Sequence, residues 1–486
     1  MIIGVIWMVL LKIAIRGLAL ISLTILARLL SPEDFGVVAM AMFVYAVLDS
    51  IAWFGFDSAL IQNQEADADH YNTAFTFNVL FYSAVALLLV VLAQPAAGYY
   101  REPRVEDILY VMALGAFAFG FENIGTVDFR KHMLYEKDFQ FMLSKKIIAF
   151  VVTIPLAYLW RNYWALVVGV LASRIGGTLI SYVLSPFRPR FTLKKAGELF
   201  AFSKWLFLNT LFFSIRTRIA EPILGRMAGP TALGHFNMGY EISNMPTTEL
   251  VAPINRAVFP GYAKIKNDLS QMRQGYLKVI GIIALVALPA AAGIGVVAPL
   301  LVPVWLGEKW LDTIPLMQVL AFSGALTAIM TNAGSVFLAM GQPRKLALLG
   351  GAYVVLLVAL IIPLTKEYGA VGAAWAYILT SLVINPIQYG FLFHLIELNA
   401  MRFIAVIIRP VLAMAAMYGC VHLLIQWMTS TGMGLVIQLL IAVVFGALVY
   451  GLTALFLWLA AGRPPGAEVD LIERVWPVIR RRLPGG

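Results

Sequence analysis

The feature that most constrains this chain is an almost unbroken succession of long apolar runs, separated by short stretches that carry most of the charge. Hydrophobic residues make up 61% of the 486 residues and charged residues only 13%, which excludes an ordinary soluble globular fold. Roughly 20 consecutive apolar residues cross a bilayer as one helix. Such segments recur from end to end, so the sequence predicts an all-α polytopic membrane protein.

The polar breaks divide the chain into about fourteen predicted transmembrane helices. The first run is too long for a signal-peptide core and precedes no cleavage pattern, so we expect it to remain as a helix. The single cysteine, Cys420, lies in an apolar run, and no disulfide framework is expected. The predicted spans are 3–30, 36–56, 74–97, 108–127, 146–160, 163–185, 203–226, 230–257, 276–305, 313–340, 346–365, 369–394, 403–427 and 433–461.

Lys and Arg residues concentrate on one side of these helices. The loops and tail on that side hold 22 of them, including five in 128–146, whereas the opposite loops hold six. Basic loops remain in the cytoplasm, so both termini are predicted to lie there. This asymmetry also explains the net charge of +10 without nucleic acid as a partner. Loop 57–73 is acidic, but acidic residues contribute little to the rule.

One pattern occurs twice, at residues 25–36 and 223–234, with a constant offset of 198 residues. Each copy contains Ile-Leu, then Arg, Pro and Gly at the same spacing. An interfacial Arg, a Pro in the first turn of the next helix and a Gly that gives the turn room indicate the hinge of a helical hairpin. The predicted hinge or turn residues are Arg28, Pro32, Gly36, Arg226, Pro230 and Gly234.

A second repeat, Ile-Pro-Leu at 154–156 and 362–364, follows at the similar offset of 208 residues. Two repeats in matching order predict a duplicated membrane bundle. The predicted domains are an N-terminal six-helix lobe (1–200), a C-terminal six-helix lobe (201–398), two additional transmembrane helices (399–462) and a cytoplasmic interfacial tail (463–486).

Further motifs accompany these repeats. The first hairpin reads Ala27-Arg-Leu-Leu-Ser-Pro-Glu-Asp-Phe-Gly36, and later segments read Ala339-Met-Gly-Gln-Pro343 and Tyr368-Gly-Ala-Val-Gly372. With these motifs the chain resembles the Wzx-type polysaccharide and O-antigen repeat-unit flippases of the multidrug/oligosaccharidyl-lipid/polysaccharide (MOP) exporter superfamily. The resemblance implies two six-helix, MATE-like lobes around a central cavity, with two extra helices.

The same resemblance implies a function. The chain would carry undecaprenyl-diphosphate-linked repeat units across the bacterial inner membrane for exopolysaccharide or lipopolysaccharide assembly. Its expected partners are this lipid-linked glycan, membrane lipids, and a polymerase and chain-length regulator of the same pathway. No enzyme activity, cofactor or metal ion is expected.

Cations within the predicted spans suit a diphosphate. Each costs about 2.5–3.5 kcal/mol near the bilayer centre by insertion scales, so it should face a wet cavity or a partner. Arg binds phosphate oxygens bidentately and stays charged. The alternative is that these side chains snorkel to the interfaces or form salt bridges, and an internal Arg218–Glu221 pair is plausible. The predicted substrate-binding cations are Lys12, Arg16, Arg174, Arg216, Arg218 and Arg256.

Carboxylates within the spans are candidates for ion coupling, because a membrane carboxylate can release and rebind a proton during a cycle. The alternative is a fixed partner for a nearby Arg. The candidates are Asp49, Glu122, Glu241 and Glu249. Asp67-Ala-Asp69-His70 matches the metal motif of glycosyltransferases, but no nucleotide-sugar domain surrounds it, and we interpret it as a solvated loop.

Three other functions remain open. A multidrug exporter of the same superfamily would be expected to have an acidic lumen. A membrane polysaccharide polymerase or ligase would need a large outer loop with catalytic residues, whereas every predicted outer loop is short. A scaffold membrane protein would not need charges within its spans. Because the chain contains no ATP-binding motif, we expect alternating access driven by counter-ion flow.

Overall fold

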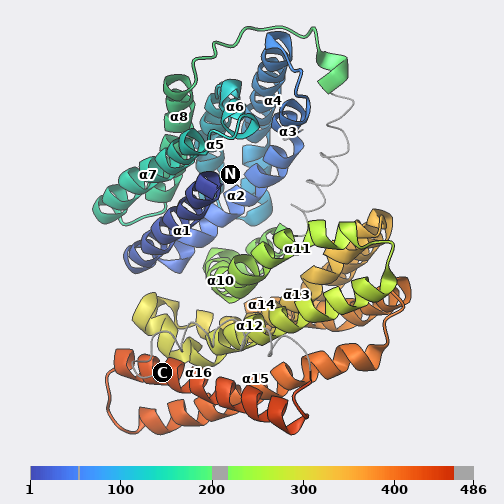
Figure 1. The fold of residues 1–486 in the computed structure, drawn as a ribbon. Coiled ribbons are helices and arrows are strands. Elements are labelled where there is room, and N and C mark those ends of the chain that lie inside the picture. The colour runs from blue at the N-terminus through green and yellow to red at the C-terminus, as the bar shows by residue number, and fades with distance from the viewer. Residues whose placement is uncertain (1, 53–54, 200–216, 465–486) are drawn as a thin grey trace, which may run out of the picture. The chain divides into compact units, whose positions relative to one another are not determined.

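The computed structural model describes the chain except for residues 1, 53–54, 200–216 and 465–486. Every regular element within the described ranges is a helix (Figure 1). The chain divides into two compact units, Met1–Gly234 and His235–Gly486. The predicted lobe boundary at 200/201 lies in a gap, and the tail lies almost wholly outside the described residues. Both therefore stay predictions.

In the first unit, consecutive long helices pack side by side: α4 lies along α5, and α7 lies along α8. α7 also packs against α1, from the beginning of the chain. The elements are α1 (Ile2–Leu29), α2 (Pro32–Ala52), α3 (Phe56–Gln62), α4 (Ala68–Tyr100), α5 (Arg104–Gly120), η1 (Ile124–Thr126), α6 (Val127–Lys131), α7 (Tyr135–Trp160), α8 (Trp164–Leu184) and the first part of α10 (Ala220–Met245).

The second unit continues from α10 through a short π-helix. Its core joins α12, α13 and the end of α14 around fully buried Tyr276 and Phe337. α15 and α16 pair with each other and pack on α12. The elements are η2 (Pro246–Val251), α11 (Ala252–Lys264), α12 (Leu269–Trp305), η3 (Glu308–Trp310), α13 (Thr313–Ala339), α14 (Pro343–Leu395), α15 (Ala400–Thr429) and α16 (Leu435–Ala460).

Within the described residues, nine helices are long and apolar enough to cross a membrane. A tenth is present if α5 and the η1–α6 segment, bent by 68°, form one span. The chain is therefore a multi-pass, all-α membrane protein, as predicted. The 53 residues of α14 contain a break at Gly369, where φ is 60°. This break lies at the predicted boundary between spans 346–365 and 369–394.

Two segments predicted as loops contain helices. The basic loop 128–146 is occupied by α6 and the first turns of α7, which begins at Tyr135. The acidic loop 57–73 contains most of α3 and the start of α4, capped by Asp67. The starts of α4 and α7 were not predicted because their first turns are polar. A membrane helix can extend beyond the apolar run that crosses the bilayer.

Candidate functional site

A charged cluster lies among the helices of the first unit. Tyr45 and Asp49 are four residues apart on α2, hence on one helix face, and the Tyr45 hydroxyl donates a hydrogen bond to Asp49 Oδ1 at 3.3 Å. Arg174 of α8 approaches the same oxygen, with 4.0 Å between Nη2 and Oδ1. Its guanidinium carbon also lies 5.4 Å from the centre of the Tyr45 ring. These contacts place Asp49 between a phenol and a guanidinium.

A second ion pair joins the middle of α7 to the turn that follows α5. Lys145 Nζ donates to Glu122 Oε2 at 2.7 Å, and these side chains are only 20% and 17% exposed. The ammonium also lies 4.8 Å from the centre of the Phe141 ring. Lys145, assigned from the sequence to a basic loop, is therefore a half-buried partner of a predicted coupling carboxylate.

Phe119 connects the two ion pairs. Its ring centre lies 4.3 Å from the Arg174 guanidinium carbon and 5.3 Å from Lys145 Nζ. Both cations are therefore within cation–π range of one aromatic ring. Beside them, a cavity of about 70 Å³ is lined by Phe119 and other apolar residues and by polar ones that include Tyr82 and Glu122. A polar cavity of this size has room for water next to Glu122.

This arrangement keeps charge inside an apolar bundle. An isolated ion would cost several kcal/mol there, and the cost falls when an opposite charge and hydrogen bonds are supplied. The Arg174–Asp49 separation is at the outer limit of an ion pair, whereas Lys145–Glu122 is a close contact. Arg174 is accordingly held less closely by its carboxylate than Lys145 is.

The structure places the other predicted cations on α1, just before α10 and on α11. Arg218, which precedes α10, pairs with Glu221 of its first turn at 3.2 Å, which confirms the predicted internal pair. Lys12 is exposed and Arg16 half-buried on α1. Arg256 is exposed on α11 of the second unit. Arg216 lies outside the described residues.

The predicted carboxylates separate in the same way. Asp49 and Glu122 belong to the cluster of the first unit. Glu241 is exposed on α10 and Glu249 is half-buried in η2, both in the second unit. No group of three or more His, Cys, Asp or Glu side chains in the described ranges is arranged to hold a metal ion.

The repeated hinge residues meet each other within the first unit. A Cβ atom on Gly36 would overlap the carbonyl oxygen of Pro230, and one on Gly234 would overlap that of Pro32. The structure places both glycines one turn inside their helices rather than in the turns themselves. Their role is therefore to let two helix starts cross with their backbones in contact.

The arginines of the repeat do not share this contact. Arg28 is exposed in the last turn of α1. Arg226 lies over the ring of Tyr99, with its guanidinium carbon 5.7 Å from the ring centre.

A further ionic group lies at the end of the unit where the first hinge turns. Arg104 bonds Glu102 at 2.7 Å and also contacts Glu33 at the start of α2. The hydrogen bond from Arg104 lowers the pKa of Glu102, so this carboxyl stays ionised at neutral pH. Asp34 accepts a hydrogen bond from the Tyr163 N–H at 2.9 Å. These contacts connect the hinge to the α4–α5 and α7–α8 turns.

Sequence reasoning missed three residues of the charged cluster: Tyr45, Phe119 and Lys145. The spacing of Tyr45 and Asp49 was a usable signal, since residues four apart share a helix face. Phe119 and Lys145 offered none, because their partners lie on other helices and an aromatic or a lysine in membrane sequence has many ordinary roles.

Comparison with known proteins places these features in context. A family model described as polysaccharide biosynthesis protein matches residues 25–315. The chain is 23% identical to the lipopolysaccharide biosynthesis protein WzxC of Escherichia coli K12 over 390 residues, which cover 79% of each chain. It is 28% identical to the teichuronic acid biosynthesis protein TuaB of Bacillus subtilis 168 over 431 residues, covering 84% of this chain and 85% of TuaB.

Solved structures show the same fold. An inward closed form of the lipid II flippase MurJ matches with a TM-score of 0.75 at 14% identity, covering 94% of this chain and all of MurJ. An inward-facing MATE multidrug transporter of the MOP superfamily matches with a TM-score of 0.63 at 15% identity, covering 82% of this chain and all of that one. At these identities the likeness shows a MurJ-like and MATE-like fold.

Proposed function

Because the chain belongs to the polysaccharide biosynthesis protein family, that of the Wzx-type flippases in the MOP superfamily, we propose that it carries lipid-linked oligosaccharide repeat units across the bacterial inner membrane. The units serve exopolysaccharide or lipopolysaccharide assembly, and the carrier lipid is undecaprenyl diphosphate. Its relatives include WzxC and the succinoglycan biosynthesis transport protein ExoT of Rhizobium meliloti, which is 23% identical over 497 residues.

The observation that carries this proposal is the position of Arg174 and Lys145. Both are cations within the helical bundle of the first unit, each has a carboxylate partner, and water-sized space adjoins one of the pairs. A diphosphate headgroup needs such cations to leave water, because an unpaired anion in an apolar medium is very costly. Arg174 supplies the planar donors that suit phosphate oxygens.

Exchange of partners couples the headgroup to protons. The diphosphate competes with Asp49 for Arg174, so headgroup binding and the charge state of this carboxylate are linked. In this scheme Asp49 and Glu122 are coupling groups. The remaining predicted cations stay candidates for headgroup binding: Lys12, Arg16, Arg218, Arg256 and Arg216, the last of which lies outside the described residues.

The proposed architecture has fourteen spans in two six-helix lobes with two additional helices. Two breaks within described helices support a larger number of spans than the number of long helices suggests. α14 is broken at Gly369, and its 53 residues would extend about 80 Å, more than twice the apolar thickness of a bilayer. α10 is interrupted at Gly229 immediately before Pro230. Alternating access proceeds as the helix starts pivot at the crossing of Gly36 and Gly234.

The test is flipping of a fluorescent undecaprenyl-diphosphate oligosaccharide by the purified chain in liposomes. Arg174→Ala should slow flipping by about tenfold or more, the range expected for a lost charge-assisted hydrogen bond. Asp49→Asn should keep flipping but remove its response to a proton gradient. Arg273→Ala, which removes an ion-paired arginine of the second unit, is the matched control and should leave both properties intact.

Normal flipping in Arg174→Ala would defeat the assignment of the headgroup site. Flipping of the wild type that ignores every ion gradient would defeat the coupling. Substitution of Arg218 or Arg256 by Ala should also reduce polymer export without lowering protein levels. Export of organic cations, with no movement of the diphospho-lipid, would favour the multidrug exporter instead.

A further inference from the structure

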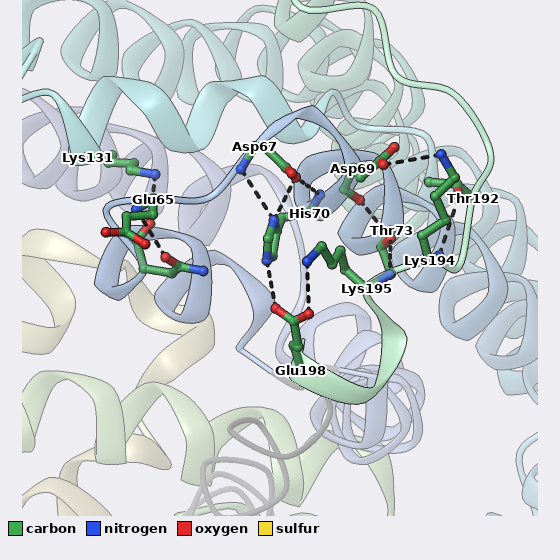
Figure 2. Close-up of polar contacts among 11 residues, drawn as sticks. Glu65, Asp67, Asp69, His70, Thr73, Lys131, Thr192, Lys194, Lys195 and Glu198 are labelled. Atoms are coloured by element: carbon green, nitrogen blue, oxygen red, sulfur yellow. Dashed lines mark hydrogen bonds and ion pairs between the residues drawn. The ribbon is translucent and has the colours of Figure 1, made fainter.

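Residues 186–199 follow α8 and form a strap that lies along the first three turns of α4 (Figure 2). Aromatic contacts assist, since the Phe187 and Phe191 rings lie 5.6 Å from the rings of Tyr71 and Phe75. Backbone N–H groups of the strap donate to side chains of α4, at 2.7 Å from Arg190 to Asn72, 3.0 Å from Thr192 to Thr76 and 3.3 Å from Lys195 to Thr73.

His70 is the titratable group at the centre of this contact. It is 6% exposed, and its two ring nitrogens face two different carboxylates. Nδ1 lies 2.7 Å from Asp67 Oδ1, at the start of α4, and Nε2 lies 3.1 Å from Glu198 Oε2, in the strap. Figure 2 shows the imidazole between them. His70 therefore bridges the helix and the strap.

A neutral imidazole cannot satisfy both contacts, because only one of its nitrogens carries a proton. If Nε2 carries it, the ring still donates to Glu198, and Nδ1 can accept from the Asp67 N–H at 3.3 Å. In that state the Nδ1 lone pair also faces the Asp67 carboxylate, which is repulsive. The imidazolium donates to both carboxylates, so the protonated ring makes the stronger bridge.

The surrounding charges keep the carboxylates ionised. The hydrogen bond from His70 lowers the pKa of Asp67. Lys195 first, and then His70, lower the pKa of Glu198. Lys194 pairs with Asp69 at 3.2 Å beside the same turn. Imidazole is the side-chain type in this cluster whose ordinary charge change falls between about pH 5 and 8.

We propose that His70 is a proton-sensitive latch, which holds the 186–199 strap more firmly to α4 when the ring is protonated. The sign follows from the contacts: the extra attraction is present at low pH and is lost as the pH rises and the imidazolium deprotonates. The strap connects α8 to the residues that follow it, so protonation of His70 changes how stably this connection is held against α4.

Amide hydrogen exchange of the full chain in lipid nanodiscs tests the latch. After correction for the intrinsic pH dependence of exchange, protection of peptides from 186–199 should fall about two- to fivefold between roughly pH 5.5 and 8, the range of a partly exposed ion pair. His70→Gln can donate to Glu198 but cannot be protonated, so its protection should not vary with pH. Glu198→Gln should reduce the variation as well.

His132→Gln is the matched control, because His132 lies 3.8 Å from Asp128, is 60% exposed and makes none of the strap contacts described above. It should keep the wild-type pH response, and peptides of α12 and α13 report whether each variant is folded. Protection in the wild type that does not change with pH would overturn the latch. So would a pH response that persists in folded His70→Gln.

Discussion

The two copies of the hinge pattern share their proline and glycine but start the following helix differently. In the first copy Ser31 caps α2, with Pro32 in the first helical position. The Ser31 N–H donates to Asp34 Oδ2 at 2.8 Å, and the Asp34 N–H donates back to the Ser31 hydroxyl at 3.2 Å. This is a capping box with aspartate in the acidic position.

The second copy has no side chain for that purpose at its corresponding position. Gly229 stands where the first copy has Ser31, and it adopts φ 82° and ψ 177°, which interrupts α10 before Pro230. Residues with a side chain rarely adopt this conformation. One hinge is thus fixed by side-chain hydrogen bonds and the other by a backbone conformation that glycine permits.

The comparison separates what the crossing requires from what each turn requires. Pro and Gly recur because each glycine, lacking a side chain, leaves room for the carbonyl oxygen of the proline on the opposite helix. The residue before the proline is free to differ, since the first N–H groups of a helix can be satisfied or rearranged in more than one way. The recurring Pro and Gly therefore belong to the crossing between the two helices, whereas the residue before each proline only determines how its own helix begins.

The largest effect is expected at the glycine crossing. Gly36→Ala or Gly234→Ala places a methyl group against a backbone carbonyl, which no rotamer change relieves. Each should destabilise the fold by about 3 kcal/mol, at the upper end of ordinary overpacking, and block flipping. Thermal midpoints of the detergent-solubilised protein, measured beside flipping in liposomes, check this.

Gly17→Ala and Gly98→Ala are matched controls for this substitution. A Cβ at either position would meet no other atom within 4 Å, and both residues lie inside helices. They should preserve or slightly raise the midpoint, because alanine favours helix over glycine. If Gly36→Ala behaves like them, the crossing is not a close backbone contact.

Much of this could be read from the sequence, and the limit has a physical cause. Apolar run lengths predicted the polytopic helices, and Pro and Gly marked the breaks at Pro32, Gly229 and Gly369, because local backbone chemistry decides them. The reciprocal contact of Gly36 with Pro230 could not be predicted. It joins residues far apart in the chain, and nothing in the local pattern names the partner.

The charged cluster shows the same division. Asp49, Glu122 and Arg174 stood out because charges in apolar runs are costly. Lys145 was assigned to a loop, since its neighbours are polar and the partner that stabilises it, Glu122, comes from another helix. The buried His70 was missed for the same reason: its bridge to Glu198 spans 128 residues.

A smaller loss of stability is expected when the special backbone conformation at Gly229 is disturbed. Gly229→Ala forces a side chain into a region of φ and ψ that glycine almost alone occupies, so we expect a loss of about 1–3 kcal/mol. Gly261→Ala, at a glycine in α11 with open space around its Cα, is the control and should be neutral. A neutral Gly229→Ala would mean that the second hinge tolerates a conventional helix start, and the contrast between the hinges would disappear.

The smallest effect concerns the first hinge, where side chains replace the special backbone. Ser31→Ala removes the hydroxyl that accepts the Asp34 N–H and should cost about 1 kcal/mol. Ser31→Asp retains an acceptor for that N–H, but places a second carboxylate beside Asp34, so it should recover part of the stability. Thermal midpoints of the two variants, compared in one detergent, decide between a capping role and simple packing. If Ser31→Ala and Ser31→Asp lower the thermal midpoint equally, Ser31 matters for its size. Only a capping role distinguishes a side chain that accepts a hydrogen bond from one that cannot.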